Sequence, residues 1–182
     1  MVYPAWEWKS EIPSNVCDII IENFNSDYKE GKVGEQETYN KDIRNVEVSF
    51  RKTSWINALI GGYIRYANFV NFHYDLSDED KEVLQFSKYT EGCFYKQHTD
   101  YGDNDAHITR KLSLSLELSD ENEYEDGELI LYNNVNNSTI TACKSKGSII
   151  VFDSRMTHEV TPVTSGTRYS LVKWYHGDQP LK

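Results

Sequence analysis

The feature that most constrains the fold is a run of strict alternation in the second half of the chain. From Leu112 to Leu118 every second residue is leucine, and the residues between the leucines are serine, serine and glutamate. Successive side chains of a β-strand point to opposite faces, so this pattern predicts a half-buried strand whose leucines face the core. Ser119-Asp120 follows and predicts the turn that closes the strand.

Segments of similar character surround this strand. The further predicted strands are Val83 to Tyr89, Phe94 to Asp100, Glu128 to Tyr132, Ser138 to Cys143, Ser148 to Phe152 and Tyr169 to Tyr175. Turn-forming pairs separate several of them, at Asp126-Gly127, Lys146-Gly147 and Ser165-Gly166. Many short strands with turns at this spacing predict a mainly β fold, namely a sandwich, barrel or jelly roll.

The first third of the chain predicts two helices, over Pro13 to Phe24 and over about Thr53 to Asn68. Their apolar residues recur at helical spacing and predict one buried stripe on each: Val16, Ile19, Ile20 and Phe24 on the first, and Trp55, Ile56, Leu59, Ile60, Tyr63 and Ile64 on the second. The polar stretch from Asn25 to Lys41 predicts a loop, and the period shifts toward two from Phe69 onward.

Composition narrows the class of protein. A chain of 182 residues is most simply one domain, and a net charge of −10 argues against general nucleic-acid binding. No apolar run approaches the roughly 20 residues of a membrane helix, and the first residues do not resemble a signal peptide, so we expect no membrane segment and a cytoplasmic location. Three separated cysteines, Cys17, Cys93 and Cys143, predict free thiols in a reducing compartment. No particular oligomeric state is predicted.

A His-Thr-Asp tripeptide, His98 to Asp100, stands far ahead of His158 and Arg168. Two imidazoles and one carboxylate on one face of a metal form the facial triad of non-haem Fe(II) oxygenases. Strand alternation puts His98 and Asp100 on the same face, and the third ligand then comes from a distant strand folded alongside. The alternative is that the tripeptide is accidental and that His158 is an ordinary packed histidine. Ligating histidines must be neutral, so metal affinity is expected to fall below about pH 6.5.

The chain from roughly Ser87 to Asp178 resembles the Fe(II)/2-oxoglutarate dioxygenases, and among them the prolyl-hydroxylase-like branch, which includes the PKHD-type hydroxylases. The matching motifs are Tyr89 to Asp100 (similar to Y-x-x-G-x-x-Y-x-x-H-x-D), Leu116 to Ser119, Asp126 to Leu129, Gly147 to Phe152, His158 to Val163, and Gly166 to Leu171 with Trp174. One departure is Asp126, which takes the place of the first glycine of the family's G-G-E-L turn. Another is the acidic loop from Tyr101 to His107. This loop has two possible interpretations, a lip that contacts substrate or a solvated connection between strands.

The resemblance implies a double-stranded β-helix, or jelly roll, over residues 83–178, with residues 1–82 as a helical supporting region of one catalytic domain, 1–182. It implies that His98, Asp100 and His158 bind Fe(II), and that Arg168 holds the distal carboxylate of 2-oxoglutarate. A planar guanidinium suits that role because it binds a carboxylate through two parallel hydrogen bonds. Tyr89 is expected to help hold the same carboxylate, while Tyr95 and Trp174 are expected to line the substrate pocket.

The implied reaction uses O₂ as cosubstrate, releases succinate and CO₂, and hydroxylates an unactivated C–H, with ascorbate supporting turnover. The expected substrate is a prolyl residue in a peptide or protein. The alternatives are hydroxylation of a free amino acid or other small molecule, a non-catalytic jelly-roll binding module, and a zinc hydrolase using the same ligands. Six other aromatic and imidazole groups are expected to lie outside the chemistry: Trp6, Trp8 and Trp55 to pack, His73 and His176 to be structural, and His107 to lie at the rim of the site.

Overall fold

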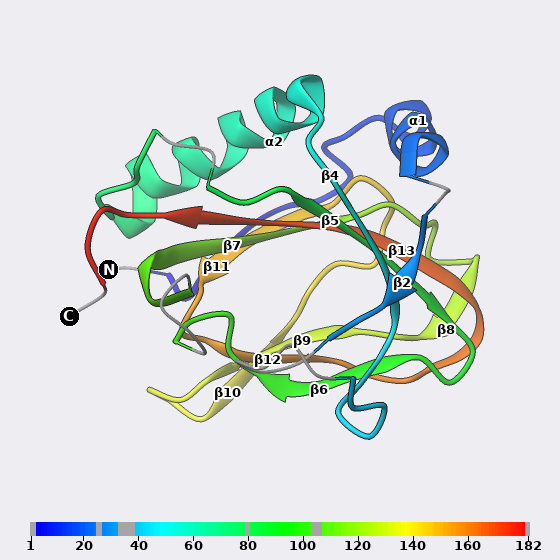
Figure 1. Cartoon of the computed structure of the whole chain (residues 1–182). Coiled ribbons are helices and arrows are strands. Elements are labelled where there is room, and N and C mark those ends of the chain that lie inside the picture. The colour runs from blue at the N-terminus through cyan, green and yellow to red at the C-terminus, as the bar shows by residue number, and fades with distance from the viewer. Residues whose placement is uncertain (1–2, 25–26, 33–38, 79–80, 103–106, 181–182) are drawn as a thin grey trace.

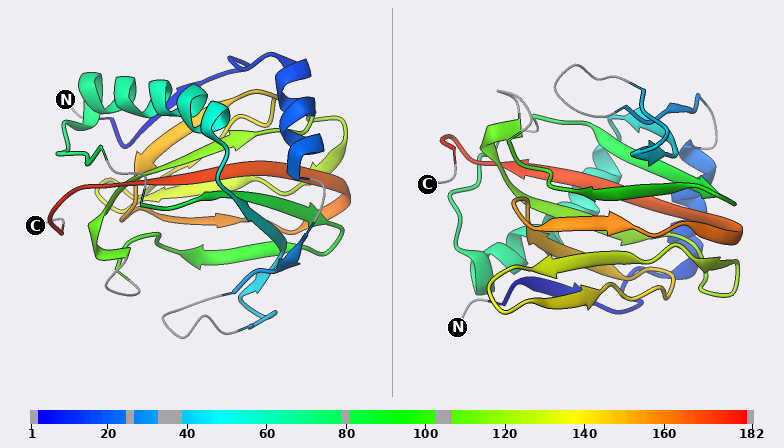
Figure 2. Two further views of the ribbon diagram at one scale, coloured as in Figure 1. Left: turned by 45° about the horizontal axis from the view of Figure 1, so that its top comes forward. Right: turned by 90° about the horizontal axis from the view of Figure 1, so that it is seen from below.

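The computed structural model describes residues 3–24, 27–32, 39–78, 81–102 and 107–180. Two antiparallel β-sheets lie face to face, and two helices cover the outer face of the larger sheet (Figure 1). Seen from below, the smaller sheet lies in front of the larger one (Figure 2). This layered arrangement confirms the prediction of a mainly β jelly roll with N-terminal supporting helices.

The larger sheet contains eight strands. In spatial order they are β1 (Ala5–Trp8), β11 (Ile149–Asp153), β7 (Arg110–Glu117), β13 (Val163–His176), β5 (Leu84–Thr90), β4 (Glu47–Arg51) and β2 (Lys29–Glu30), with β8 (Tyr124–Asp126) paired to β13 outside this series. Neighbours in this order come from distant parts of the sequence, so the sheet contains strands from both the N-terminal and the C-terminal part of the chain.

The smaller sheet contains five strands. Their order is β10 (Ser138–Thr141), β9 (Leu129–Asn133), β12 (Thr157–Val160), β6 (Phe94–His98) and β3 (Arg44–Asn45). Strand β12 lies between β9 and β6, and His158 of β12 faces His98 of β6 in the antiparallel register. The strand pairing itself therefore brings together two residues that are far apart in the sequence.

Helices α1 (Ser14–Phe24) and α2 (Ser54–Ala67) pack on the larger sheet, as predicted, and α2 continues into a π-helical turn, η1 (Asn68–Phe72). A short 3₁₀ helix, η2 (His107–Thr109), precedes β7. The buried stripes differ slightly from the predicted ones. In α1 the buried residue is Cys17, whereas Ile19 is 45% exposed, and in α2 Trp55 is 43% exposed. The prediction that Trp55 packs inside the protein is therefore wrong.

Strand β7 corrects the prediction of a half-buried strand, because residues on both of its faces are buried. The leucines face the helices, and they pack in one cluster with Ile56, Ile60 and Phe24. The alternate residues, Ser113, Ser115 and Glu117, are equally buried because they face the space between the two sheets. Buried polar side chains on an inner sheet face need polar partners or a ligand.

The N-terminal region is less helical than predicted. It supplies β1, β2 and β4 to the larger sheet and β3 to the smaller one, and none of these strands was predicted. Strands β8 and β12 were also missed, and the expected change of period after Phe69 is wrong because η1 occupies that position. These strands span two to five residues, too few for alternation to be visible, and their partners lie far away in the sequence.

One expectation from composition is confirmed. All three cysteines are free thiols. Among the residues that the structure describes, no helix is long and apolar enough to cross a membrane.

Candidate metal centre and cosubstrate pocket

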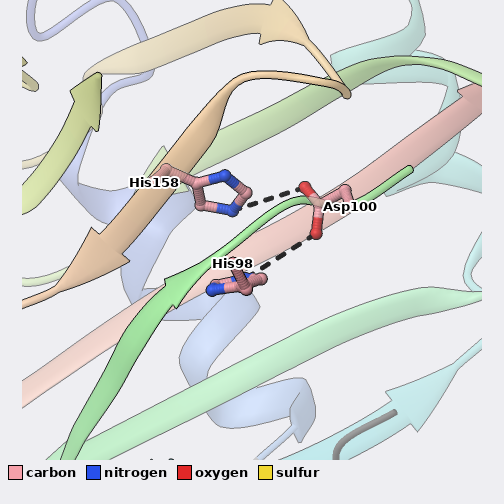
Figure 3. A group of neighbouring side chains, drawn as sticks. All are labelled: His98, Asp100 and His158. Carbon is pink, nitrogen blue, oxygen red and sulfur yellow. Dashed lines mark ion pairs between the residues drawn. The ribbon is translucent and has the colours of Figure 1, made fainter. Parts of the chain in front are cut away.

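His98, Asp100 and His158 converge at one end of the space between the sheets (Figure 3). One ligand atom from each lies within 4.8 Å of the others, so a single ion can contact all three. Asp100 lies between the imidazoles, with Oδ1 3.9 Å from Nε2 of His98 and Oδ2 3.5 Å from Nε2 of His158. Asp100 is not part of β6, which ends at His98; it lies two residues beyond, where its backbone N–H donates to the carbonyl of Ser154.

Both imidazoles are oriented in the same way. Nδ1 of His98 is 2.8 Å from the carbonyl oxygen of Lys96, and Nδ1 of His158 is 2.9 Å from that of Met156. A carbonyl can only accept, so each Nδ1 carries the proton and each Nε2 is left with a free lone pair. That lone pair is the ligand atom that a metal requires, and a second hydrogen bond at Nδ1 is the usual support for a metal-binding histidine.

The Asp100 carboxylate is fixed from behind by a hydroxyl. Ser113 Oγ donates to Oδ2 of Asp100 at 2.6 Å and itself lies 3.0 Å from Oγ of Ser154. Arg110 donates to the backbone carbonyl of Asp100 at 3.0 Å. The supporting residues come from β7 and from Ser154, which directly follows β11, so the larger sheet positions a ligand that follows a strand of the smaller one.

The protonation of this group favours metal binding. Burial, together with the neighbouring His158, lowers the pKa of His98 to about 3. Burial alone would raise the pKa of Asp100, but the two imidazoles, Arg110 and the Ser113 bond outweigh it and hold that pKa below its usual range. His98 therefore stays neutral well below pH 6.5, and the predicted onset of metal loss on acidification moves to lower pH for this ligand.

The three residues line a cavity of about 500 Å³ that also contains Arg168, Tyr89, Tyr95 and Trp174. All seven residues predicted for the site thus border one space, although they come from β5, β6, β12, β13 and the segment after β6. His107 lines the same cavity, as expected of a rim residue, whereas His176 is buried behind it and bonded to Thr109 and Glu82. Of the acidic loop, residues 103–106 lie outside the described part of the chain.

Arg168 is 3% exposed and lies opposite Tyr89 in the β13–β5 register, with its guanidinium carbon 5.4 Å from the Tyr89 ring centre. Burial raises the pKa of Tyr89, so its hydroxyl stays protonated. Arg168 forms an ion pair with Glu117 of β7, at 2.9 Å from both Nε and Nη2 to one carboxylate oxygen. Its Nη1 is buried and has no hydrogen-bond partner among the described residues. Arg168 borders the cavity, and the buried hydroxyl of Tyr124, which also lacks a hydrogen-bond partner there, lies beside it. An unsatisfied guanidinium N–H in the wall of a cavity fits a bound carboxylate.

The residues on the mouth side form two further groups. Tyr95 stacks on His98 with ring centres 3.5 Å apart, and the guanidinium carbon of Arg44 lies 4.6 Å from the ring centre of Tyr95. Trp174 contacts Arg110, whose guanidinium carbon is 4.1 Å from the indole. Arg110 in turn donates to both carboxylate oxygens of Glu82 at 2.6 Å.

Sequence reasoning missed Glu117, Ser113, Arg110 and Arg44. The first two were assigned to the outer face of a half-buried strand. For Glu117 one signal existed, because an arginine expected inside the site needs an acidic partner, and Glu117 is that partner. For Arg110 and Arg44 the sequence carries no signal, since their roles depend on contacts with Trp174 and Tyr95 across the fold.

The turn in the G-G-E-L position explains the departure at Asp126. Asp126 and Gly127 both have positive φ, 58° and 63°, a conformation that glycine adopts freely and aspartate tolerates better than most residues. A side chain at 127 would lie 2.7 Å from Val163 and 3.5 Å from Cδ of Arg168. Gly127 therefore lets the turn approach the arginine closely, while the first position of the motif accepts aspartate.

Comparisons with known proteins agree with this geometry. The PKHD-type hydroxylase of Shewanella oneidensis is 35% identical over 92 residues, which is 49% of this chain and 40% of that protein. A PKHD-type hydroxylase of Parvibaculum lavamentivorans is 36% identical over 94 residues, again 40% of its length. The matched part of the chain thus spans less than half of these relatives.

Solved structures share the fold across nearly the whole chain. A prolyl-4-hydroxylase from Pseudomonas putida superposes with a TM-score of 0.76 at 17% identity, covering 96% of this chain and 93% of that one. A Trichoplax adhaerens prolyl hydroxylase, in complex with a peptide of the hypoxia-inducible factor oxygen degradation domain, gives 0.78 at 16% identity, covering 96% and 84%. Finally, the family model of the 2OG-Fe(II) oxygenase superfamily matches residues 84–176, about half of the chain and all of the strands that carry the triad and Arg168. The chain therefore belongs to the 2OG-Fe(II) oxygenase superfamily.

Proposed function

We propose that this protein is an Fe(II)- and 2-oxoglutarate-dependent dioxygenase that hydroxylates a prolyl residue in a peptide or protein. The observation that carries the proposal is the placement of His98, Asp100 and His158 on the wall of the same cavity as Arg168. A metal-binding triad alone fits many proteins, but a triad beside a buried arginine with a free N–H fits a metal with a carboxylate-bearing cosubstrate.

The bound iron and 2-oxoglutarate would supply the oxidising chemistry, with O₂ consumed and succinate and CO₂ released. The chain itself contributes binding and orientation. Nε2 of each histidine and a carboxylate oxygen of Asp100 would hold the metal, and Arg168 with the Tyr89 hydroxyl would hold the distal carboxylate of the cosubstrate. The leucines of β7 pack against α1 and α2 on the helix side of the sheet, which holds this strand in place beside the cavity.

The mouth of the cavity supports a peptide substrate. Tyr39 and Phe50 border it and are 57% and 51% exposed, so apolar and aromatic surface is presented to solvent around the opening. Exposed aromatic rings suit an apolar pyrrolidine side chain carried on an extended backbone. The peptide-bound Trichoplax adhaerens relative supports the same class of substrate. Tyr95 and Trp174 would line the substrate side of the pocket.

The proposal also covers the domain, its location and the reductant. Residues 1–182 would act as a single catalytic domain, since strands from both ends of the chain complete the sheets. A cytoplasmic location is supported by three free thiols, which suit a reducing compartment. Ascorbate would support turnover by keeping the iron ferrous.

The test is a turnover assay with Fe(II), 2-oxoglutarate and ascorbate, in which proline-containing peptides and free amino acids are compared and succinate and the hydroxylated product are both measured. We expect peptide hydroxylation with equal amounts of succinate, lost in His98→Ala and strongly reduced in Arg168→Ala. Oxidation of free amino acids alone would contradict the peptide substrate. Zinc-dependent hydrolysis exceeding oxidation would contradict the reaction itself.

A further inference from the structure

Glu117 occupies an unusual position, because it faces the arginine that the proposed function assigns to 2-oxoglutarate. Its Oε2 accepts from both Nε and Nη2 of Arg168 at 2.9 Å, and its Oε1 lies 3.3 Å from the backbone N–H of Ser119. The side chains of Arg168 and Glu117 are only 4% and 6% exposed. The two charges thus form a buried pair in which glutamate contacts the guanidinium from its Nε side.

This side-on contact leaves part of the guanidinium free. Arginine has five N–H donors in a planar fork, and the Nη1–Nη2 edge can bind a second carboxylate through two parallel bonds. Nη1 has no partner among the residues that the structure describes. The distal carboxylate of 2-oxoglutarate can therefore reach Arg168 without displacing Glu117.

Binding of the cosubstrate changes the balance of buried charge around Arg168. Without cosubstrate, one cation and one anion balance, whereas with cosubstrate one guanidinium faces two carboxylates in a site shielded from water. Burying an uncompensated charge is strongly unfavourable, and a buried group usually changes its protonation instead.

The groups facing Glu117 offer little compensation. They are Arg168 of β13, Tyr124 of β8, Lys144 after β10, Cys143 beside it, Glu7 of β1 and Cys17 of α1. Glu7 is a further anion and accepts the backbone N–H of Cys143 at 2.7 Å. Lys144, the remaining cation of this set, donates to the backbone carbonyl of Asp126 at 2.7 Å. Burial already raises the pKa of Glu117, and the attraction of Arg168 only partly opposes it.

We propose that Glu117 takes up one proton from solvent when the distal carboxylate of 2-oxoglutarate binds Arg168, and returns it when the cosubstrate or its product leaves. Cosubstrate affinity is then linked to pH through a residue that touches neither the metal ligands nor the substrate. The inference rests on the proposed role of Arg168 as the carboxylate anchor.

The experiment is calorimetric titration of 2-oxoglutarate into the protein loaded with Mn(II), a redox-stable substitute for Fe(II), in pairs of buffers that differ in heat of ionisation. The difference in apparent enthalpy counts the protons exchanged. Above the pKa of Glu117 in the free protein we expect uptake of about one proton per cosubstrate and affinity that falls about tenfold per pH unit. Pyruvate is a 2-oxo acid without the distal carboxylate and controls for protons exchanged at the metal.

The matched variants are Glu117→Gln, which keeps the shape but cannot ionise, and Glu125→Gln, which removes the same charge at an exposed position of β8. We expect Glu117→Gln to lose the proton uptake and to bind at least tenfold more tightly at high pH, and Glu125→Gln to behave as the wild type. Because the uptake is measured first on the wild type, a misfolded Glu117→Gln does not block the test.

The possible failures are distinguishable. If the wild-type protein binds Mn(II) but no 2-oxoglutarate, the proposed function is wrong. If it binds 2-oxoglutarate with no more proton uptake than pyruvate, Arg168 can still be the anchor and the proposal for Glu117 alone is wrong.

Discussion

Ser113→Ala tests how the fold positions the metal ligands. The Ser113 hydroxyl donates to Oδ2 of Asp100 at 2.6 Å, and both side chains are buried, at 0% and 8% exposure. A hydrogen bond to a charged group contributes about 1.5–3 kcal/mol. A free-energy difference of roughly 1.4 kcal/mol is a factor of ten in an equilibrium constant. Complete loss of this hydrogen bond should therefore lower metal affinity about 10- to 100-fold.

The assay is competition for Mn(II) or Fe(II) against a chelator of known affinity, under anaerobic conditions for iron. Ser115→Ala is the matched control, because Ser115 lies on the same inner face of β7 and no bond joins it to Asp100 in the described structure. We expect the control to keep wild-type affinity. Metal affinity of Ser113→Ala within twofold of the wild type, in a folded protein, would show that this hydroxyl does not hold Asp100 in place.

Three further predictions concern the acid response, the backbone and the mouth of the site. Burial alone would raise the pKa of Glu82, but bonds from His176 and Arg110 lower it to about 2 from an ordinary 4.5. The ionised Glu82 therefore stabilises the fold fully above pH 4.5, and this contribution is lost toward pH 2. Glu82→Gln should lower the free energy of unfolding at pH 7 and reduce the loss of stability between pH 4.5 and pH 2 in acid titrations. An unchanged pH profile would contradict this. Gly147 has φ 83°, and an added Cβ would lie 2.0 Å from the carbonyl oxygen of Ile12. Gly147→Ala should therefore lower the free energy of unfolding by at least about 1–3 kcal/mol in urea denaturation. Wild-type stability of this variant would disprove the close approach. Arg44→Gln removes the cation beside Tyr95 and should change metal affinity by less than tenfold, because the lost contact of about 0.5–1 kcal/mol is opposed by the removal of a positive charge that acts on His98; a loss as large as that of His98→Ala would mean that Arg44 does more than support the stack.

The sequence predicted the long elements well, because their periodicity is visible over many residues. The leucines of β7 and the stripes of α1 and α2 are examples, and the predicted bounds of these three elements differ from the observed ones by at most two residues. The longest strand, β13, is the exception, because it begins at Val163 and was predicted only from Tyr169. Strands such as β12 and β4 have four and five residues, and each is defined by its partners rather than by its own pattern. Their assignment needs the three-dimensional pairing, which one sequence does not reveal.

The same distinction holds for the site. His98, Asp100, His158 and Arg168 follow from motifs that need particular chemical groups at fixed positions. Glu117 was overlooked because the alternation rule assigns it to the outer face of a strand with one buried side. In a double-layered β fold the second face of a central strand encloses the pocket, so polar residues that alternate with leucines are candidates for the site.

Binding of iron and 2-oxoglutarate at the triad can be tested by an anaerobic titration of the protein with Fe(II) and 2-oxoglutarate, followed by visible absorption. We expect a charge-transfer band that needs both additions, disappears in His98→Ala and weakens in Arg168→Ala. Absence of the band from the folded wild-type protein, or a band unchanged by His98→Ala, would contradict the assignment of this triad as the iron site.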